Sequence, residues 1–479
     1  MTLLMLLEMI ASAFADRVAI GTAAGGITYG ELLARAGAGA EVIRGHGAEH
    51  LAYVGESDVA FPVAVFAAAW AGVPLLPLNY RLADDQLQEL LGQHDDVLVL
   101  TEEPTRVPGM PIAHWNAATA AGADPGPSTA DGEDVAVLLY TSGTTSAPKA
   151  VVLRHRHLTS YVISSVEFAG ADEGDATLTS VPPYHIAGVA NVVSNVYAGR
   201  RVVYLPTFTP ETWLETVRAE GISHAMVVPT MLARVVEHLG DAPAGCDGLR
   251  SLAYGGARMP VTVLERALAA FPGTDFVNAY GLTETSSTIA VLGPEDHRKA
   301  MEGDDAARSR LGSCGRLVPG IEVEVRDGEV WVRGEQVSGE YLGQGGALDP
   351  DGWFPTRDRG WVDDEGYLFI EGRSDDTIIR GGENIAPAEI EDALLAHPAV
   401  AQAAVVGLPD EEWGQRLAAA VVLRAGEEVD AEALRAFARE RLRSSKTPDV
   451  IAFRDDLPMT DTGKLLRRVV LADLLGEPS

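Results

Sequence analysis

Cysteine is scarce in this sequence, because the 479 residues include only Cys246 and Cys314. Two cysteines are too few for a disulfide-rich fold. Neither of them has a second Cys or a His at the spacing of a metal motif. We therefore interpret both as reduced, structural residues and find no cysteine-based metal site. Reduced thiols are typical of the cytoplasm, which is the compartment that we expect.

Positive charge is also scarce. Lysine and arginine together number 37 against 69 aspartates and glutamates, which gives a formal net charge of −32. Proteins that bind nucleic acid in general present a basic surface, so this balance excludes nucleic acid as a general partner. Small anionic ligands are still compatible with it, since they need only a local basic patch.

Apolar runs of membrane-spanning length are absent unless they contain charges or helix breakers. Segment 60–77 comes nearest, but it is interrupted by proline and glycine, so we predict no membrane span. The leucine-rich start, residues 1–15, lacks a basic leading region and is interrupted by Glu8. We favour an amphipathic helix there and keep a signal peptide as the alternative.

Short apolar runs alternate with alanine-rich helical stretches through about residue 370. Near-continuous apolar strands between helices are typical of parallel sheets covered on both faces, where ligands bind at the carboxyl ends of strands. The sequence therefore predicts an α/β fold with a large N-terminal domain of parallel-rich sheets covered by helices. The expected strands are 51–54, 73–76, 97–101, 135–140, 201–205, 225–228, 249–254 and 276–280.

The pattern changes twice toward the C-terminus. Residues 323–372 contain short strand signals without helices, which predicts a small β-barrel-like subdomain. A small mobile C-terminal α+β domain follows, with helices at 387–396 and 431–442 and strands at 401–406 and 417–423. The length supports more than one domain. We predict an N-terminal domain at 1–372, a hinge at 373–375 and a C-terminal domain at 376–479.

A hydroxyl-rich loop within residues 140–149 follows the predicted strand 135–140 and ends at Lys149. Backbone N–H groups, hydroxyls and one ammonium can together hold a polyphosphate. The loop is not a Walker loop, which needs a second glycine directly before Lys-Ser/Thr. A solvated surface turn is the alternative that this loop alone leaves open.

Further chemistry-bearing segments follow in the sequence. Residues 278–285 leave a predicted strand and supply an aromatic ring, a hydroxyl and a carboxylate, while Asp358 suits a sugar diol. A glycine-rich turn spans 381–385, and Lys464 ends the turn 458–464. Each has an ordinary alternative when taken singly, such as a core tyrosine or a solvated lysine.

In this order and at these separations, the segments resemble the motifs of the adenylate-forming superfamily of acyl-CoA synthetases, adenylation domains and luciferases. The resemblance runs from residues 27–32 to Lys464, nearly the whole chain. It implies a ligase that joins a carboxylic acid to AMP with ATP and Mg²⁺, releases pyrophosphate, and then transfers the acyl group to CoA. Ser146 and Ala150 replace glycines that are usual in the family, and we still expect a working loop.

The resemblance also implies a nucleotide site. The residues that would hold the β- and γ-phosphates are Thr141, Ser142, Gly143, Thr144, Thr145 and Lys149. Those around the base and ribose would be Gly255, Gly256, Ala257, Asn278, Ala279, Tyr280, Gly281, Asp358 and Arg373. Thr283 would contact the α-phosphate and Glu284 would bind Mg²⁺, while Lys464 would bridge the α-phosphate and the substrate carboxylate.

The acid pocket is expected beside His185, in segment 181–188, which resembles the acyl- and aryl-CoA synthetase version of its motif. A backbone-bonded structural histidine is the alternative for His185. No aspartate equivalent to the one that binds an amino group in adenylation domains is evident, which favours an acid without that amine. The expected walls are His185, Ala187, Asn191, Tyr254, Gly255, Ala257, Gly281 and Ser286. An aliphatic, alicyclic or aromatic monoacid fits these walls.

The acceptor thiol is expected to enter near Gly381, Gly382 and Glu383. Free CoA and the phosphopantetheine arm of an acyl carrier protein would take similar routes, so both stay open. The resemblance implies a hinge at Asp375 that presents first Lys464 and then the 381–383 turn to one pocket. A non-catalytic nucleotide-binding relative and a homodimer are further open alternatives.

Overall fold

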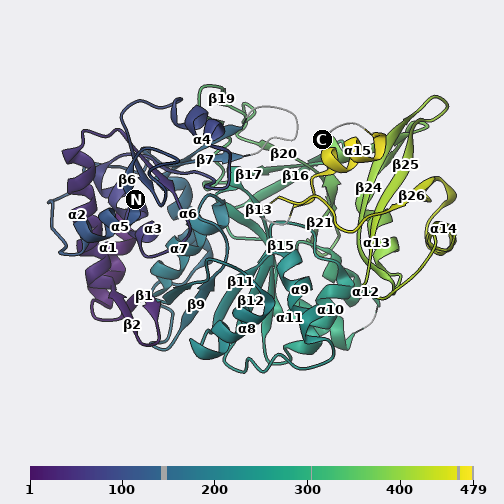
Figure 1. Cartoon of the computed structure of the whole chain (residues 1–479), viewed down its shortest axis with the longest axis horizontal. Coiled ribbons are helices and arrows are strands. Elements are labelled where there is room, and N and C mark those ends of the chain that lie inside the picture. The colour runs from purple at the N-terminus through teal and green to yellow at the C-terminus, as the bar shows by residue number, and fades with distance from the viewer. Residues whose placement is uncertain (142–147, 304, 461–463, 477–479) are drawn as a thin grey trace.

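The computed structural model of the chain describes residues 1–141, 148–303, 305–460 and 464–476. No helix in these residues is long and apolar enough to cross a membrane. Figure 1 shows a large group of elements, coloured purple to green, and a smaller yellow-green group at one end of the long axis. The predicted mixed α/β fold with a large N-terminal part and a small C-terminal part is confirmed.

The longer of the two large sheets has nine strands. Its neighbours run parallel from β13 to β1, as the near-continuous apolar runs predicted. The order is β15 (Arg316–Leu317), β14 (Ser287–Leu292), β13 (Asp275–Leu282), β12 (Ser251–Gly255), β11 (His224–Val227), β9 (Ala176–Thr179), β10 (Arg201–Tyr204), β1 (Val18–Thr22) and β2 (Gly25–Thr28).

The second large sheet has eight strands and carries the start of the hydroxyl-rich loop. Its central strands β7, β4, β3 and β5 are parallel, whereas β8 returns antiparallel to β7 after the loop. The order is β19 (Gly345–Gly346), β18 (Glu340–Tyr341), β8 (Lys149–Arg154), β7 (Val135–Thr141), β4 (Leu75–Pro77), β3 (His50–Val54), β5 (Val97–Thr101) and β6 (Met110–Pro111).

Helices cover both sheets. One apolar core joins strands of both sheets to α1 (Leu3–Ala13), α2 (Tyr29–Gly45), α3 (Ala60–Ala71), α5 (Ile112–Thr119), α6 (His155–Ser165) and α7 (Ile186–Ala198). A second core gathers α8 (Pro210–Ala219), α9 (Pro229–Leu239), α10 (Val261–Ala270) and α11 (Pro294–Glu302) on the nine-stranded sheet. The remaining helices of this part are α4 (Asp84–Leu91) and α12 (Asp305–Ser309). The predicted amphipathic first helix is confirmed, because α1 buries Leu3, Leu6 and Leu7 while Met5 is exposed.

The helix-free segment 323–372 contributes most of a four-stranded antiparallel sheet. Its order is β16 (Glu322–Arg326), β17 (Glu329–Arg333), β20 (Phe354–Val362) and β21 (Leu368–Arg373). Buried Val330, Val332 and Leu368 give it an apolar core shared with β14. This sheet places Asp358 and Arg373 opposite each other on adjacent strands.

The C-terminal part begins after the short 3-10 turn Ser374–Asp376, which overlaps the predicted hinge at 373–375. Its elements are β22 (Ile378–Arg380), β23 (Glu383–Ile385), α13 (Pro387–Leu395), β24 (Val400–Asp410), β25 (Gly414–Leu423), α14 (Ala431–Arg439), β26 (Val450–Phe453) and α15 (Arg467–Leu475). Its two apolar clusters are made of residues from 378 onward. The exact division at 373–375 stays a prediction.

Candidate active site

The carboxyl ends of β7, β12 and β13 carry three of the predicted segments. Thr141 ends β7 and pairs with Lys149 across the loop, and its hydroxyl donates to the Lys149 carbonyl at 3.4 Å. Ser142, Gly143, Thr144 and Thr145 lie outside the described residues. Ala150 is buried in β8 opposite Tyr140, so its methyl group fits inside the sheet.

Two glycines near the site are required by close backbone approach. A Cβ on Gly255 would lie 2.2 Å from the Ala279 carbonyl oxygen, and one on Gly281 would lie 1.7 Å from that of Ser287. Any side chain at either position would push adjacent strands apart. These glycines therefore keep β12, β13 and β14 in register, whatever else they contact. Asn278 also has a structural bond, from its side-chain amide to the Ser313 carbonyl at 3.1 Å.

Tyr280, Asp358 and Arg373 come together although 78 residues separate the first two in the chain. The Tyr280 hydroxyl donates to the Asp358 carboxylate at 2.5 Å, and the Arg373 guanidinium lies 3.3 Å from it. Asp358 is only 4% exposed. Burial raises the pKa of Asp358, while the charges of Arg373 and Lys464 oppose that rise. The Asp358 carboxylate, whose negative charge is balanced by Arg373, can accept a hydrogen bond from a ribose hydroxyl.

Glu284 lies on the 3-10 turn Thr283–Thr285 directly after β13. Its side chain accepts a hydrogen bond from the Tyr341 hydroxyl at 2.8 Å, and its carbonyl accepts one from the Ser338 N–H at 2.8 Å. No cluster of three or more His, Cys, Asp or Glu able to hold a metal exists in the described part of the chain. A lone carboxylate fits Mg²⁺, which usually takes one or two protein carboxylates together with substrate phosphates.

A cavity of about 430 Å³, open to solvent, lies beside His185, Gly255 and Gly256. Lys464, from the C-terminal part, also lines it. The Lys464 N–H donates to the Thr460 hydroxyl at 2.9 Å. Residues 185 and 464 therefore meet in one cavity although they belong to different parts of the fold.

The charges around Lys464 are mixed. The surrounding protein lowers the pKa of Lys464 and the positive charge of Arg373 adds to this, whereas Asp358 and Glu284 act in the opposite direction. The side chain still reaches solvent. The lysine is thus a cation placed among two carboxylates and a guanidinium, where an anionic ligand would gain from both positive charges.

His185 is a neutral donor in this cavity. Its Nδ1 accepts the Ala187 N–H at 3.1 Å, so the neutral ring carries its proton on Nε2. Burial lowers the pKa of His185 to about 4, with a contribution from the Lys464 ammonium. At neutral pH the ring can donate a hydrogen bond without adding a positive charge.

Part of the predicted pocket wall does not line this cavity and stays a prediction. Asn191 bonds Thr179, Tyr254 bonds His297, and the Ser286 hydroxyl donates to the Gln336 carbonyl, so these side chains are engaged elsewhere. Ala257 and Gly281 are also absent from the described lining, whereas His185, Ala187 and Gly255 belong to it. The walls that sequence reasoning missed are Ser180, Val181, Pro182, Met226, Val228 and Met231. The signal for Met226 and Val228 was available, since both lie at the carboxyl end of β11.

The residues of the turn at 381–383 are not among those that line the cavity in the described part of the chain. Gly381 and Gly382 have φ angles of 57° and 83° and join β22 to β23. The Gly381 N–H donates to the Trp413 carbonyl at 2.8 Å. Of Lys464 and this turn, only Lys464 is among the described residues that line the cavity.

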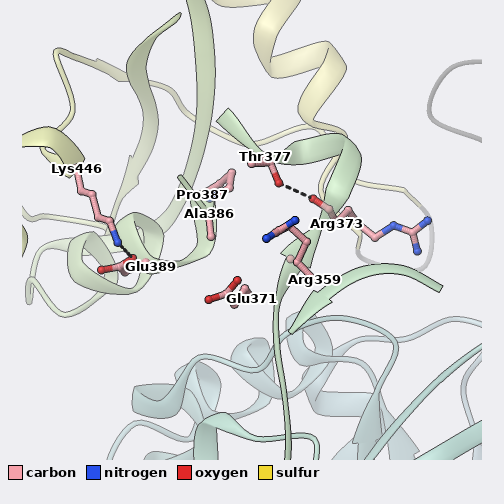
Figure 2. Close-up of a pocket in the computed structure, with 9 residues that line it drawn as sticks. Arg359, Glu371, Arg373, Thr377, Ala386, Pro387, Glu389 and Lys446 are labelled. Carbon is pink, nitrogen blue, oxygen red and sulfur yellow. Dashed lines mark hydrogen bonds and ion pairs between the residues drawn. The ribbon is translucent and has the colours of Figure 1, made fainter. Parts of the chain in front are cut away.

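A second cavity, of about 450 Å³, lies where the chain passes from β21 to the C-terminal part. Figure 2 shows Arg359 and Glu371 on one side of it and Glu389 and Lys446, which form an ion pair, on the other. Its lining comes from both parts of the fold. The two parts are therefore separated by a solvent-accessible gap beside the predicted hinge.

The Tyr280–Asp358–Arg373 trio, the Glu284 carboxylate and the cavity lined by His185 and Lys464 are the features expected of a nucleotide-dependent ligase. Comparison with known families agrees: those described as AMP-binding enzyme and AMP-binding enzyme C-terminal domain match residues 7–342 and 389–464. The chain belongs to the AMP-binding enzyme family, and the predicted superfamily is confirmed.

Similar proteins span almost the same length. A fatty acid–[acyl-carrier-protein] ligase, ScoC, of Streptomyces coeruleorubidus is 32% identical, covering 88% of this chain and 86% of the relative. A feruloyl-CoA synthase of Amycolatopsis sp. is 33% identical, covering 92% of both. The o-succinylbenzoate CoA synthetase of Bacillus subtilis, solved with its acyl-adenylate intermediate, is 30% identical with a TM-score of 0.84 and 97% of both chains covered. That enzyme was also solved with ATP and magnesium ion, which agrees with the ATP, Mg²⁺ and CoA expected from the sequence.

Proposed function

We propose that this protein is an acid–CoA ligase, which forms an acyl-adenylate from ATP and a carboxylic acid and then makes the CoA thioester. The single observation that supports it most is the meeting of Lys464, His185 and Gly255 in one cavity. The charges of Glu284, Asp358 and Arg373 act on the same lysine. A carboxylate and an α-phosphate are both anionic, so a positioned cation between them lowers the cost of bringing them together.

In the first half-reaction a carboxylate oxygen of the acid attacks the α-phosphorus. A C–O–P link forms, the bond from the α-phosphorus to the bridging oxygen breaks, and pyrophosphate leaves with that electron pair. Lys464 would contact both anionic groups. The neutral Nε2–H of His185 would donate a hydrogen bond that orients the carboxylate without placing a second positive charge beside it. Mg²⁺, held through Glu284, would neutralise phosphate charge when bound.

In the second half-reaction the thiol sulfur attacks the acyl carbonyl. A C–S bond forms, the bond from carbon to the AMP oxygen breaks, AMP leaves, and the thiol proton goes to solvent. Lys464, and not the 381–383 turn, lines the cavity in the present arrangement, so the predicted hinge at Asp375 would have to turn before Gly381, Gly382 and Glu383 could approach.

The acid is proposed to be an aliphatic, alicyclic or aromatic monoacid. Apart from the catalytic pair, the described lining is mostly apolar and includes Met226, Val228 and Met231. Lys464 is the only charged side chain in that lining, and it is committed to the reacting carboxylate. A second carboxylate deeper in the cavity would lose its hydration without gaining a cation, which disfavours diacids.

A carrier-protein acceptor is the second candidate, because a relative of 32% identity is named as an acyl-carrier-protein ligase. The two candidates share the first half-reaction and differ only in the thiol. Purified protein, a panel of monoacids, ATP and Mg²⁺ should release pyrophosphate, and mass spectrometry then shows whether free CoA or a phosphopantetheinylated carrier protein takes the acyl group. The absence of pyrophosphate release with every acid would refute both.

Lys464→Ala should lower acid-dependent pyrophosphate release by about 10²–10³-fold, the effect of removing one preorganised charge-stabilising donor. Thioester formation from a preformed acyl-adenylate should be nearly unchanged. That step breaks the bond from the acyl carbon to the AMP oxygen and releases no pyrophosphate, so it does not need Lys464. Lys299→Ala removes a lysine paired with Glu295 on the surface and serves as the control. Equal loss of both half-reactions would contradict the role given to Lys464.

A further inference from the structure

Tyr341 contacts two of the groups that the proposed function needs, although no motif of the sequence singled it out. Its hydroxyl donates to Oε1 of Glu284 at 2.8 Å. The Nζ atom of Lys149, at the end of the phosphate loop, lies 5.5 Å from the centre of its ring. One side chain therefore touches the candidate metal carboxylate and the candidate phosphate cation.

The backbone around Tyr341 is hydrogen-bonded to β8, which begins at Lys149, and to the turn that carries Glu284. Tyr341 pairs with Val151 of β8, and the Leu342 N–H donates to the Ala150 carbonyl at 2.9 Å. On the other side, the Ser338 N–H donates to the Glu284 carbonyl at 2.8 Å. The strand β18 is thus fixed between β8, which begins at Lys149, and the turn that carries Glu284.

We propose that Tyr341 is a positioning residue for ATP activation, which fixes Glu284 for the metal and Lys149 for the polyphosphate; this rests on the proposed function. A carboxylate with one oxygen bound to a hydroxyl keeps its other oxygen for a cation. The ring offers the lysine an aromatic face, which favours the ammonium near the loop.

Two substitutions separate the contacts. Tyr341→Phe keeps the ring beneath Lys149 and removes the hydroxyl, whereas Tyr341→Leu removes both. Removing a group that hydrogen-bonds a metal ligand typically lowers metal affinity or activity by 10–100-fold. By calorimetry without any acid, Tyr341→Phe should weaken ATP binding at least tenfold in Mg²⁺ and leave binding in EDTA unchanged. Tyr341→Leu should weaken binding in EDTA as well.

A matched control exists elsewhere in the large part. The Tyr367 hydroxyl donates to Asp296 at 2.6 Å, and two arginines, Arg310 and Arg316, lie over its ring at 5.0 and 4.6 Å. Tyr367→Phe therefore removes the same kind of bond from the same kind of surroundings away from the site. It should leave ATP binding unchanged in both conditions.

A double-substitution cycle keeps the test decisive if one variant folds poorly. Adding Tyr341→Phe to Glu284→Gln should cause no further loss of ATP binding in Mg²⁺, because the hydroxyl acts through that carboxylate. An ATP affinity of Tyr341→Phe equal to wild type in Mg²⁺, or lowered equally in EDTA, would overturn the proposal, as would additive losses in the cycle. Failure of wild type to release pyrophosphate would instead refute the proposed function, and the binding measurement would still decide the role of Tyr341.

Discussion

At the scale of single residues, Asp358 shows how the fold stabilises a buried carboxylate. The carboxylate lies in a nearly closed site but accepts from Tyr280 and faces Arg373. An unpaired buried charge would be strongly unfavourable, so each partner stabilises the others. A nucleotide hydroxyl that donates to this carboxylate would meet an acceptor already held in place.

Asp358→Ala should therefore weaken ATP binding. A hydrogen bond to a charged group contributes about 1.5–3 kcal/mol, which corresponds to roughly 10–150-fold in affinity. Equilibrium ATP titration measures this, and Asp296→Ala, which removes the carboxylate paired with Tyr367, is the control. Unchanged ATP affinity in Asp358→Ala, alongside reduced thermal stability, would show that the trio is purely structural.

Residue identities predicted the site unevenly. The segments around Tyr280, Asp358 and Lys464 were visible because unusual residue types stand close together in the sequence. Met226 and Met231, which line the cavity, were not predicted, since they are ordinary apolar residues whose exposure to a cavity depends on tertiary packing. Tyr341 was missed because its two partners lie far away in the sequence.

At the scale of elements, the start of α6 joins the first helix to the eight-stranded sheet. Nδ1 of His155 accepts the Leu3 N–H at 3.3 Å, and Nδ1 of His157 accepts the Arg154 N–H at 3.1 Å. Both side chains are 1% exposed. Burial lowers the pKa of His155 to about 4 and that of His157 to about 3. Each histidine accepts its hydrogen bond through Nδ1, and protonation of that nitrogen would remove the acceptor.

These histidines should make the fold sensitive to mild acid. An unfolded histidine has a pKa near 6.5, so below that pH the unfolded chain binds protons that the folded chain excludes. Stability is therefore full above about pH 6.5 and falls as the pH drops toward 4, by about 2 kcal/mol per histidine between pH 7 and pH 5. His157→Gln keeps an acceptor for the Arg154 N–H and should flatten this slope in urea unfolding at pH 7, 6 and 5. A slope equal to that of wild type would contradict this origin.

Element order was predictable because short apolar runs alternate regularly with helical stretches. The expected strands at 51–54, 97–101 and 135–140 correspond to β3, β5 and β7. Strand pairing could not be predicted. Strand β18 pairs with β8 through one residue pair, Tyr341 with Val151, and nearly two hundred residues of sequence separate these two. That pairing is what places Tyr341 beside Lys149.

At the scale of the whole molecule, a cavity and an ion pair lie between the two parts. The cavity in Figure 2 separates β20 and β21 from α13 and Lys446. Arg258 of the large part forms an ion pair with Asp392 on α13. Their side chains are 43% and 41% exposed. A few polar contacts beside a gap can hold one arrangement of two parts without preventing another.

The order of the motifs allowed a mobile C-terminal part to be predicted, but the sequence could not indicate which arrangement it adopts. Local patterns place Lys464 on a turn and Gly381 on another, and nothing local decides which of them faces the cavity. That choice depends on weak contacts between parts, of which Arg258 with Asp392 is one. The present arrangement, with Lys464 in the cavity, suits the first half-reaction.

Asp392→Ala should therefore slow the first half-reaction selectively. A half-exposed ion pair contributes up to about 1 kcal/mol, so pyrophosphate release should fall by at most about fivefold. Thioester formation from preformed acyl-adenylate should be unchanged or faster, because it needs the other arrangement. Asp275→Ala breaks the exposed ion pair with Arg298 within the large part and should alter neither rate. Because the two half-reactions are measured separately, a decrease of both by the same factor would mean that Asp392 supports folding and not the arrangement of the two parts.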